Sequence, residues 1–152
     1  MADVHSRLAE LGLTLPPLAI PAGAYVPAVR SGTYVYVSGQ LPLADGALLA
    51  TGKVGAAVSP ERARELAGRC ALGALAAIDD LVGLAAVVKV VKVTGFVASA
   101  PGFNGQPGVI NGASEVFGQV FGEAGRHARS AVGVAELPLD APVEVEVIVE
   151  IA

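Results

Sequence analysis

The C-terminal stretch HARSAVGVAELPLDAPVEVEVIVEIA (residues 127–152) holds the residues whose types and spacing are best suited to chemistry. Arg129 comes just before a run of small and apolar residues, and Glu144 is the first of three alternating glutamates near the C-terminus. A guanidinium can hold a carboxylate by two parallel hydrogen bonds, which sets the orientation of a ligand as well as its affinity. The alternatives are a surface ion pair between Arg129 and a nearby glutamate, and a solvated role for Glu144 like that expected of Glu146 and Glu150.

The other reactive side chains do not form a second candidate centre. Cys70 falls in the middle of a predicted helix, in an apolar stripe, so we expect a core residue and not a nucleophile. His5, His127 and Cys70 are far apart and lack the i, i+3 or i, i+4 spacing of helical ligands, which predicts no metal site. His127 is expected on an exposed loop; the alternative is that it lines a site beside Arg129.

Phosphate-bearing ligands are disfavoured by motif and by charge. The segment GALLATGKV (residues 46–54) has five residues between its glycines and Val54 after the lysine, whereas a phosphate loop needs four and then Ser or Thr. It is expected to form a turn between short strands. The net charge is −4 and the sequence has no basic run, so binding to nucleic acid is not expected.

The chain is unusually apolar, yet no membrane segment is expected. Charged residues make up 16% of the chain, against about 25% in typical domains. Pro, Gly and Asn interrupt the uncharged stretches before they reach the roughly 20 residues that a span needs. The surplus of apolar surface therefore predicts a homo-oligomer. The single cysteine allows no internal disulfide, and the N-terminus is expected to form a short helix and not a signal peptide, so we expect a cytoplasmic protein.

The candidate residues must be positioned by a small set of helices and strands. A proline-rich lead-in (residues 13–27) is followed by a hairpin around Ser31-Gly32. The expected elements, in order, are strands 25–30 and 33–38, a helix over 59–81 with Ser59 as its N-cap, a strand over 85–98, a helix over 107–122, and a final hairpin of strands 129–136 and 142–151 joined by LPLDA. This order predicts a single α+β domain (residues 1–152) with a mainly antiparallel sheet and two helices on one face. The other face of this sheet must be covered too, which again indicates an oligomer.

Three motifs, taken in order, resemble the Rid (YjgF-like, reactive intermediate deaminase) family. They are AYVPAVRSGTYVYVSGQLP (24–42), GVINGASEVFGQVF (108–121) and ARSAVGVAELPLDAPVEVEV (128–147). The resemblance runs from about Tyr25 to the C-terminus, and the N-terminal extension (residues 1–22) and the long loop 98–108 suggest a longer subgroup. It implies a chorismate-mutase-like α+β fold and a homotrimer with sites in the clefts between subunits.

The resemblance also implies an activity and a set of site residues. The activity is hydrolysis of enamines and imines such as 2-aminoacrylate to keto acids and ammonia, with no cofactor. Arg129 matches the arginine that grips the substrate carboxylate, and Glu144 matches the glutamate that positions water. The other matched pocket positions are Tyr25, Ser38, Gly39 and Asn111. Ala131 departs from the pattern, because many active members carry Cys or Thr two residues after the arginine.

Three functions remain open at this point. The first is an enamine or imine deaminase acting on small 2-imino acids. The second is a non-catalytic trimer that binds small carboxylates and has a regulatory or chaperone-like role. The third is the ribonuclease or translation-inhibitor activity attributed to some relatives, which the acidic charge disfavours. The first two share Arg129 and differ at Glu144, because only catalysis needs an activated water.

Overall fold

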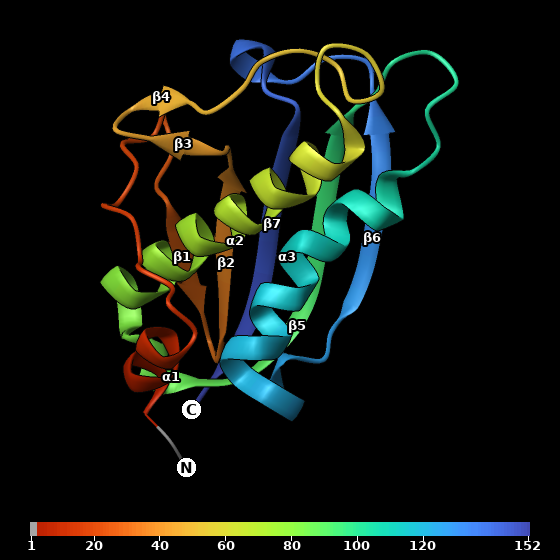
Figure 1. Cartoon of the computed structure of the whole chain (residues 1–152). Helices are drawn as coiled ribbons and strands as arrows, with labels where there is room; N and C mark the ends of the chain where they lie inside the picture. The colour runs from red at the N-terminus through yellow and green to blue at the C-terminus, as the bar shows by residue number, and fades with distance from the viewer. Residues whose placement is uncertain (1–2) are drawn as a thin grey trace.

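The computed structural model describes residues 3–152, which form one main sheet covered on one face by two helices (Figure 1). Within these residues the main sheet has five strands in the order β1-β2-β7-β5-β6. The strands are β1 (Ala28–Ser31), β2 (Tyr34–Gln40), β5 (Val87–Ala98), β6 (Ala128–Val134) and β7 (Val143–Ile151). The covering helices are α2 (Pro60–Val82) and α3 (Gln106–Phe121). The α+β architecture with a mainly antiparallel sheet is therefore confirmed.

Smaller elements complete the described part of the chain. A short helix, α1 (Val4–Glu10), begins the described residues, and the two-stranded hairpin of β3 (Leu43–Ala44) and β4 (Ala47–Leu48) follows β2. The segment 46–54, expected to form a turn between short strands, holds β4 itself, and the turn lies at its start, where Gly46 adopts a positive φ of 78° between β3 and β4. Single 3-10 turns lie at Leu84–Ala86, Gly122–Gly125 and Pro138–Asp140.

The long helix α2 begins and ends where its sequence indicates. Ser59 Oγ accepts a hydrogen bond from the Arg62 amide at 3.1 Å, and Pro60 occupies the first turn. Gly83 ends the helix with a φ of 81°, a conformation that glycine adopts without a steric penalty. The inner face of α2 carries mainly small buried residues, including Ala63, Ala67 and Cys70, which let the helix lie close to the sheet.

Glycines set the distances between layers at two points. A Cβ on Gly95 of β5 would lie 2.4 Å from Ile110, so α3 sits directly on this strand. A Cβ on Gly112 of α3 would lie 1.9 Å from the carbonyl oxygen of Arg64, so α2 and α3 touch through their backbones there. The first contact places α3, which carries Asn111, against β5, and the second places it against α2.

The predicted final hairpin is wrong, because β6 and β7 do not pair with each other. β6 runs parallel to β5 at the edge of the sheet, and β7 runs antiparallel to both β5 and β2. The reason is that β5 and β6 are joined through α3, and such a crossover connects parallel strands. The eight-residue segment 135–142 is long enough to carry the chain across β5. In this central place β7 pairs along both edges, and its five alternating apolar residues from Val143 to Ile151 are all buried.

The first predicted hairpin is confirmed, but its first strand begins later than expected. β1 starts at Ala28, so Tyr25 lies before the sheet and is 52% exposed. Pro27, which cannot donate to a strand ladder, separates Tyr25 from the strand.

The two faces of the sheet differ sharply. One face packs against α2 and α3, whereas the other carries Glu144, Glu146, Ile148 and Glu150 of β7. The strand register places Tyr36 beside Val29 and Ile148, and places Glu144 beside Phe96 and then Val132. We call the face that carries these glutamates, and that no helix covers, the open face. Val29, Tyr34, Tyr36 and Val132 on it are each more than 40% exposed, which leaves apolar surface without cover within residues 3–152.

Candidate functional site

Arg129 lies on the helix-covered side of edge strand β6 and points to α3. Its Nη1 donates to Asn111 Oδ1 at 2.7 Å and to Ser114 Oγ at 3.3 Å, and its Nη2 donates to the Pro107 carbonyl oxygen at 3.3 Å. Within residues 3–152 no carboxylate lies within 4.0 Å of the guanidinium. The alternative of a surface ion pair with a glutamate is therefore wrong. The positive charge is held by neutral oxygens and is available to an anion.

His127 lies in the connecting segment before β6, as expected, but its side chain is half-buried and reaches Ser114, a partner of Arg129. Its Nε2 lies 2.9 Å from Ser114 Oγ, and its Nδ1 lies 2.7 Å from the carbonyl oxygen of Gly125. Sequence reasoning did not single out Ser114. The signal for it was the spacing Asn111–Ser114, because residues three apart share one face of a helix.

Ala131 lies on the same side of β6 as Arg129. Its strand partner is Gly95, and its methyl group is partly buried against the core. A larger side chain at this position would therefore point along the same side of the strand as the guanidinium. Arg129, Asn111, Ser114 and Ala131 form what we call the arginine cluster.

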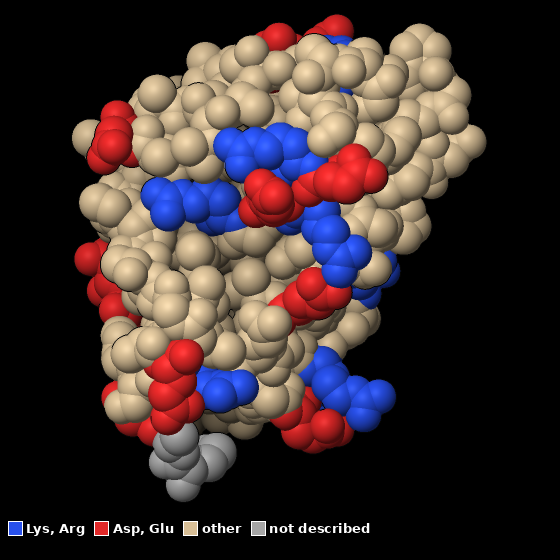
Figure 2. All heavy atoms as spheres, in the orientation of Figure 1, with Lys and Arg blue, Asp and Glu red and all other residues tan. Residues whose placement is uncertain are grey.

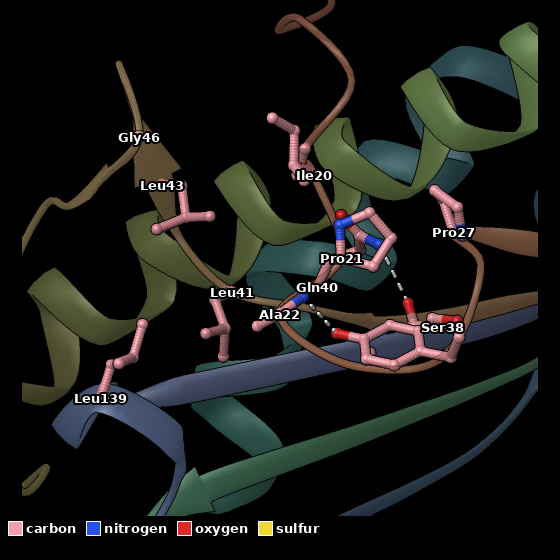
Figure 3. Close-up of a pocket in the computed structure, with 13 residues that line it drawn as sticks. Ile20, Pro21, Ala22, Pro27, Ser38, Gln40, Leu41, Leu43, Gly46 and Leu139 are labelled. Carbon is pink, nitrogen blue, oxygen red and sulfur yellow. Dashed lines mark hydrogen bonds between the residues drawn. The ribbon is translucent and has the colours of Figure 1, made fainter.

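A cavity of about 200 Å³ collects three of the other predicted site residues, Tyr25, Ser38 and Gly39. The phenol oxygen of Tyr25 accepts from the Ala22 amide at 3.3 Å, and Ser38 Oγ donates to the Val26 carbonyl oxygen at 2.6 Å. The remaining lining is mostly apolar and comes from the lead-in, the end of β2, β3 and the turn before β7. Figure 3 shows its labelled members Ile20, Pro21, Ala22, Pro27, Leu41, Leu43 and Leu139 around the cavity.

Glu144 lies next to this cavity, on the open face. A Cβ on Gly39 would lie 2.2 Å from Glu144 Oε1, so a larger residue there would displace the carboxyl group from this position. Burial raises the pKa of the Glu144 carboxyl, and the nearby charge of Glu146 raises it further. Within residues 3–152 no group donates a hydrogen bond to the Glu144 carboxyl, and neither of its oxygens is fully buried. Glu144, Gly39, Ser38 and Tyr25 form what we call the glutamate cluster.

The two clusters do not meet within one chain. Arg129 pairs with Val93 of β5, whereas Glu144 pairs with Phe96, on the other side of the same strand. Three residues along β5 and two strand spacings across it separate their Cα atoms by about 14 Å. The side chains also point to opposite sides of the sheet. A ligand bound between Arg129 and Glu144 would therefore need one cluster from a second copy.

Cys70 is a buried core residue, as expected. Burial, the largest cause, and the charge of Glu144 both raise the pKa of the Cys70 thiol, which suits a core residue and not a nucleophile. Among residues 3–152 no three His, Cys, Asp or Glu side chains are grouped so as to hold a metal ion. No helix in this range is long and apolar enough to cross a membrane.

These features agree with comparisons to known proteins. Residues 17–151 match the family model described as Endoribonuclease L-PSP, and the chain belongs to this family, also called the YjgF or Rid family. It is 45% identical over 150 residues to Protein TCP17 of Trypanosoma cruzi, covering 97% of this chain and 94% of that protein. It is 34% identical over 139 residues to a 2-iminobutanoate/2-iminopropanoate deaminase of Dermatophagoides farinae, covering 91% and 94% of the two chains.

Solved structures share the fold of this chain. The protein Atu1372 of Agrobacterium tumefaciens, whose function is unknown, superposes with a TM-score of 0.91 at 47% identity, covering 98% of this chain and 92% of that one. TdcF of E. coli with bound serine superposes with a TM-score of 0.59 at 32% identity, covering 91% and 94%.

Proposed function

We propose that this protein hydrolyses small enamines and 2-imino acids to keto acids and ammonia, at sites that two copies of the chain build together. The observation that carries the proposal is the Arg129 guanidinium, held by three neutral oxygens and paired with no carboxylate within residues 3–152. A relative named as a 2-iminobutanoate/2-iminopropanoate deaminase, and another solved with bound serine, support a small ligand that carries a carboxylate.

Arg129 binds and orients the substrate in this proposal. Its planar guanidinium binds a carboxylate by donating two parallel hydrogen bonds, a contact that a lysine cannot reproduce. Asn111 and Pro107 keep the guanidinium against α3, so the substrate is presented in one orientation. Holding the electrophilic carbon in a fixed place supplies much of the catalytic effect for a reaction of this kind.

In this proposal Glu144 activates the attacking water and transfers its proton. An enamine first takes a proton from solvent at its β-carbon and becomes the iminium ion, the protonated imine, whose C=N carbon is electrophilic. Glu144, as the carboxylate, takes a proton from water while the water oxygen forms a bond to that carbon. The C=N π electrons move to the nitrogen, which then takes the proton from Glu144. The hydroxyl group loses its proton to Glu144 as the C–N bond breaks, so the carbonyl forms and ammonia leaves. The raised pKa of Glu144 suits this exchange, because a base works best when its pKa lies nearer the working pH.

A homotrimer would bring the two clusters together. Exposed apolar residues on the open face, among them Tyr36 and Val132, need cover, and a second copy would supply it. β6 is also an edge strand, with backbone groups free to meet a neighbour. In such an assembly Arg129 of one copy would face Glu144 of the next, with the apolar cavity beside Tyr25 receiving the substrate side chain.

The ribonuclease activity in the description of the family model is not favoured here. On the face shown in Figure 2, the basic side chains over α2 and α3 lie beside acidic ones and form no continuous basic patch. Arg62 pairs with Glu65 and Arg64 pairs with Glu115 on these helices. The net charge of −4 also disfavours contact with a nucleic-acid backbone.

The deciding experiment measures keto-acid formation from enzymatically generated 2-aminoacrylate and a short panel of 2-imino acids. We expect the wild type to accelerate hydrolysis and Glu144→Gln to stop turnover while still binding pyruvate. A wild type that binds pyruvate without accelerating hydrolysis would favour the non-catalytic carboxylate-binding protein. A wild type that does neither would overturn the proposal.

A further inference from the structure

A line of hydrogen bonds leads from His127 to the Arg129 guanidinium. The carbonyl oxygen of Gly125 can only accept, so His127 Nδ1, 2.7 Å away, carries the proton. In a neutral ring Nε2 is then the acceptor, and Ser114 Oγ, 2.9 Å away, donates its proton to it. The lone pairs of Ser114 Oγ are thereby left to Arg129 Nη1, which lies 3.3 Å away.

The histidine ring is held firmly in this position. Phe117 of α3 meets it edge to face, with ring centroids 6.1 Å apart and an angle of 82° between the planes. His127 lies between a 3-10 turn and β6, two residues before Arg129, while Ser114 lies on α3. The hydrogen bonds therefore tie the beginning of β6 to the helix that faces Arg129.

One edge of the Arg129 guanidinium has fewer hydrogen-bond partners than the others and is left for a ligand. Arginine has five N–H groups in a fixed plane. Both N–H groups of Nη1 are taken, by Asn111 and Ser114, and one of Nη2 is taken by Pro107. Within residues 3–152 no acceptor is bonded to Nε, so Nε–H and one Nη2 N–H remain. Nε and Nη2 flank one edge of the plane, so this edge has the fewest partners among the described residues, and it suits a two-pronged contact with a carboxylate.

We propose that His127 and Ser114 are positioning residues for Arg129, which turn the Nε/Nη2 edge of its guanidinium toward the substrate carboxylate. This inference rests on the proposed function, because it assigns the two residues to the same carboxylate site. The His127 ring orients the Ser114 hydroxyl, and the hydroxyl holds Nη1 so that the free edge keeps one direction. Neither residue touches the substrate, so their loss weakens binding and leaves the chemical step at Glu144 unchanged.

The test is a double-mutant cycle in the full-length protein, with pyruvate as the binding probe and 2-iminopropanoate as the substrate. Ser114→Ala and His127→Phe, which keeps a ring against Phe117, should each raise the Kd for pyruvate and KM about 3- to 10-fold, with kcat within twofold. The double variant should be no worse than Ser114→Ala, because both changes cut one line of hydrogen bonds. Ser114→Thr keeps the hydroxyl and should bind as the wild type does.

Two controls separate positioning from folding. His5→Phe removes a histidine that pairs with Asp79 at 3.2 Å, away from this site, and should change neither constant. ¹⁵N NMR of the wild type should find the His127 proton on Nδ1. Wild-type affinity in His127→Phe, additive effects in the double variant, or a proton on Nε2 would each overturn the positioning role alone. A wild type that neither binds pyruvate nor hydrolyses the imine would overturn the proposed function together with it.

Discussion

At the scale of single residues, the two main residues of the proposed site are in opposite electrostatic situations. Arg129 is a cation whose partners within residues 3–152 are all neutral, and Glu144 is a half-buried carboxyl beside another carboxylate. A ligand that the described chain does not itself supply would stabilise the charge of each group. For Arg129 this ligand is an anion, and for Glu144 it is a water or a proton donor.

Replacing Arg129 should abolish the carboxylate site. Arg129→Ala should raise the Kd for pyruvate by about one to two decades, because a hydrogen bond to a charged group contributes roughly 1.5–3 kcal/mol. Arg129→Lys should lose most of this affinity as well, since an ammonium cannot form the two-pronged contact. Isothermal titration calorimetry measures both.

Arg126→Ala is the matched control for this prediction. Arg126 lies three residues earlier, is exposed and pairs with Glu123 at 3.1 Å. Its loss removes the same charge and should leave the Kd unchanged. Equal weakening in both variants would mean that only the overall charge matters.

Glu144 gives a prediction on stability and pH. A carboxyl whose pKa is raised on folding costs stability once it ionises, so the cost is present above the folded pKa and absent below the ordinary value of about 4.3. Glu144→Gln should therefore have a Tm at pH 7 at or above that of the wild type, with the difference vanishing in acid. Thermal unfolding followed by circular dichroism at pH 7 and pH 4 measures this; a lower Tm for the variant at pH 7 would contradict it.

The rate should depend on the same ionisation. If Glu144 acts as the base, deamination should fall as the pH drops through its raised pKa, which lies above the ordinary glutamate value. Glu146→Gln removes a charge that raises this pKa, so its pH–rate profile should move to lower pH. An unmoved profile would argue against Glu144 as the titrating base.

At the scale of helices and strands, the site depends on how closely α3 approaches its neighbours. Asn111, Ser114 and Pro107 all belong to α3, and all three hold Arg129. Gly112, between Asn111 and Ser114, allows α3 to touch α2 through the backbone. The helix position, and with it the arginine cluster, thus depends on a residue without a side chain.

Two glycines of α3 should respond oppositely to substitution. A Cβ at Gly112 would meet the Arg64 carbonyl oxygen, so Gly112→Ala should destabilise the protein by about 1–3 kcal/mol through forced separation of the helices. Gly118 has nothing within 4 Å of its Cβ position, so Gly118→Ala should stabilise by up to about 1 kcal/mol. Urea unfolding at one protein concentration compares them, and destabilisation of equal size in both variants would refute the close-contact argument.

At the scale of the whole molecule, the exposed open face and the separated clusters have one common explanation in a homo-oligomer. Light scattering should find a trimer for the wild type. Tyr36→Glu, which places a charge on the open face, should yield smaller species, because burying an unpaired charge is costly. Leu81→Glu changes a residue of similar exposure at the end of α2 and should leave the assembly intact. A monomeric wild type would remove the shared site.

Mixed oligomers would test the shared site directly. Arg129→Ala and Glu144→Gln should each be inactive alone, but co-expression at equal amounts should restore activity at roughly one quarter of the sites, where each copy supplies the intact residue that its neighbour lacks. No recovery in oligomers shown to contain both variants would contradict a site built from two copies.

Local sequence patterns were sufficient to predict most of the helices and strands. The Ser59-Pro60 start of α2, the turn at Ser31-Gly32 and the alternating valines of β7 depend on neighbours in sequence, so the sequence predicted them correctly. Resemblance supplied the site residues, and their assignment remains a proposal. Strand order could not be predicted in the same way, because pairing of β6 and β7 with each other, or each with β5, satisfies the same local pattern.

The sequence by itself determined the helices, the strands and the two-sided character of β7, since these follow from periodicity, caps and turns. The tertiary structure alone decided that β5 separates Arg129 from Glu144, because the crossover through α3 places β6 at the edge of the sheet. It also decided that His127 and Ser114 reach Arg129, since α3 and β6 are brought together only when both pack against β5. Contacts between residues distant in sequence have no local signal, and the candidate site is made of such contacts.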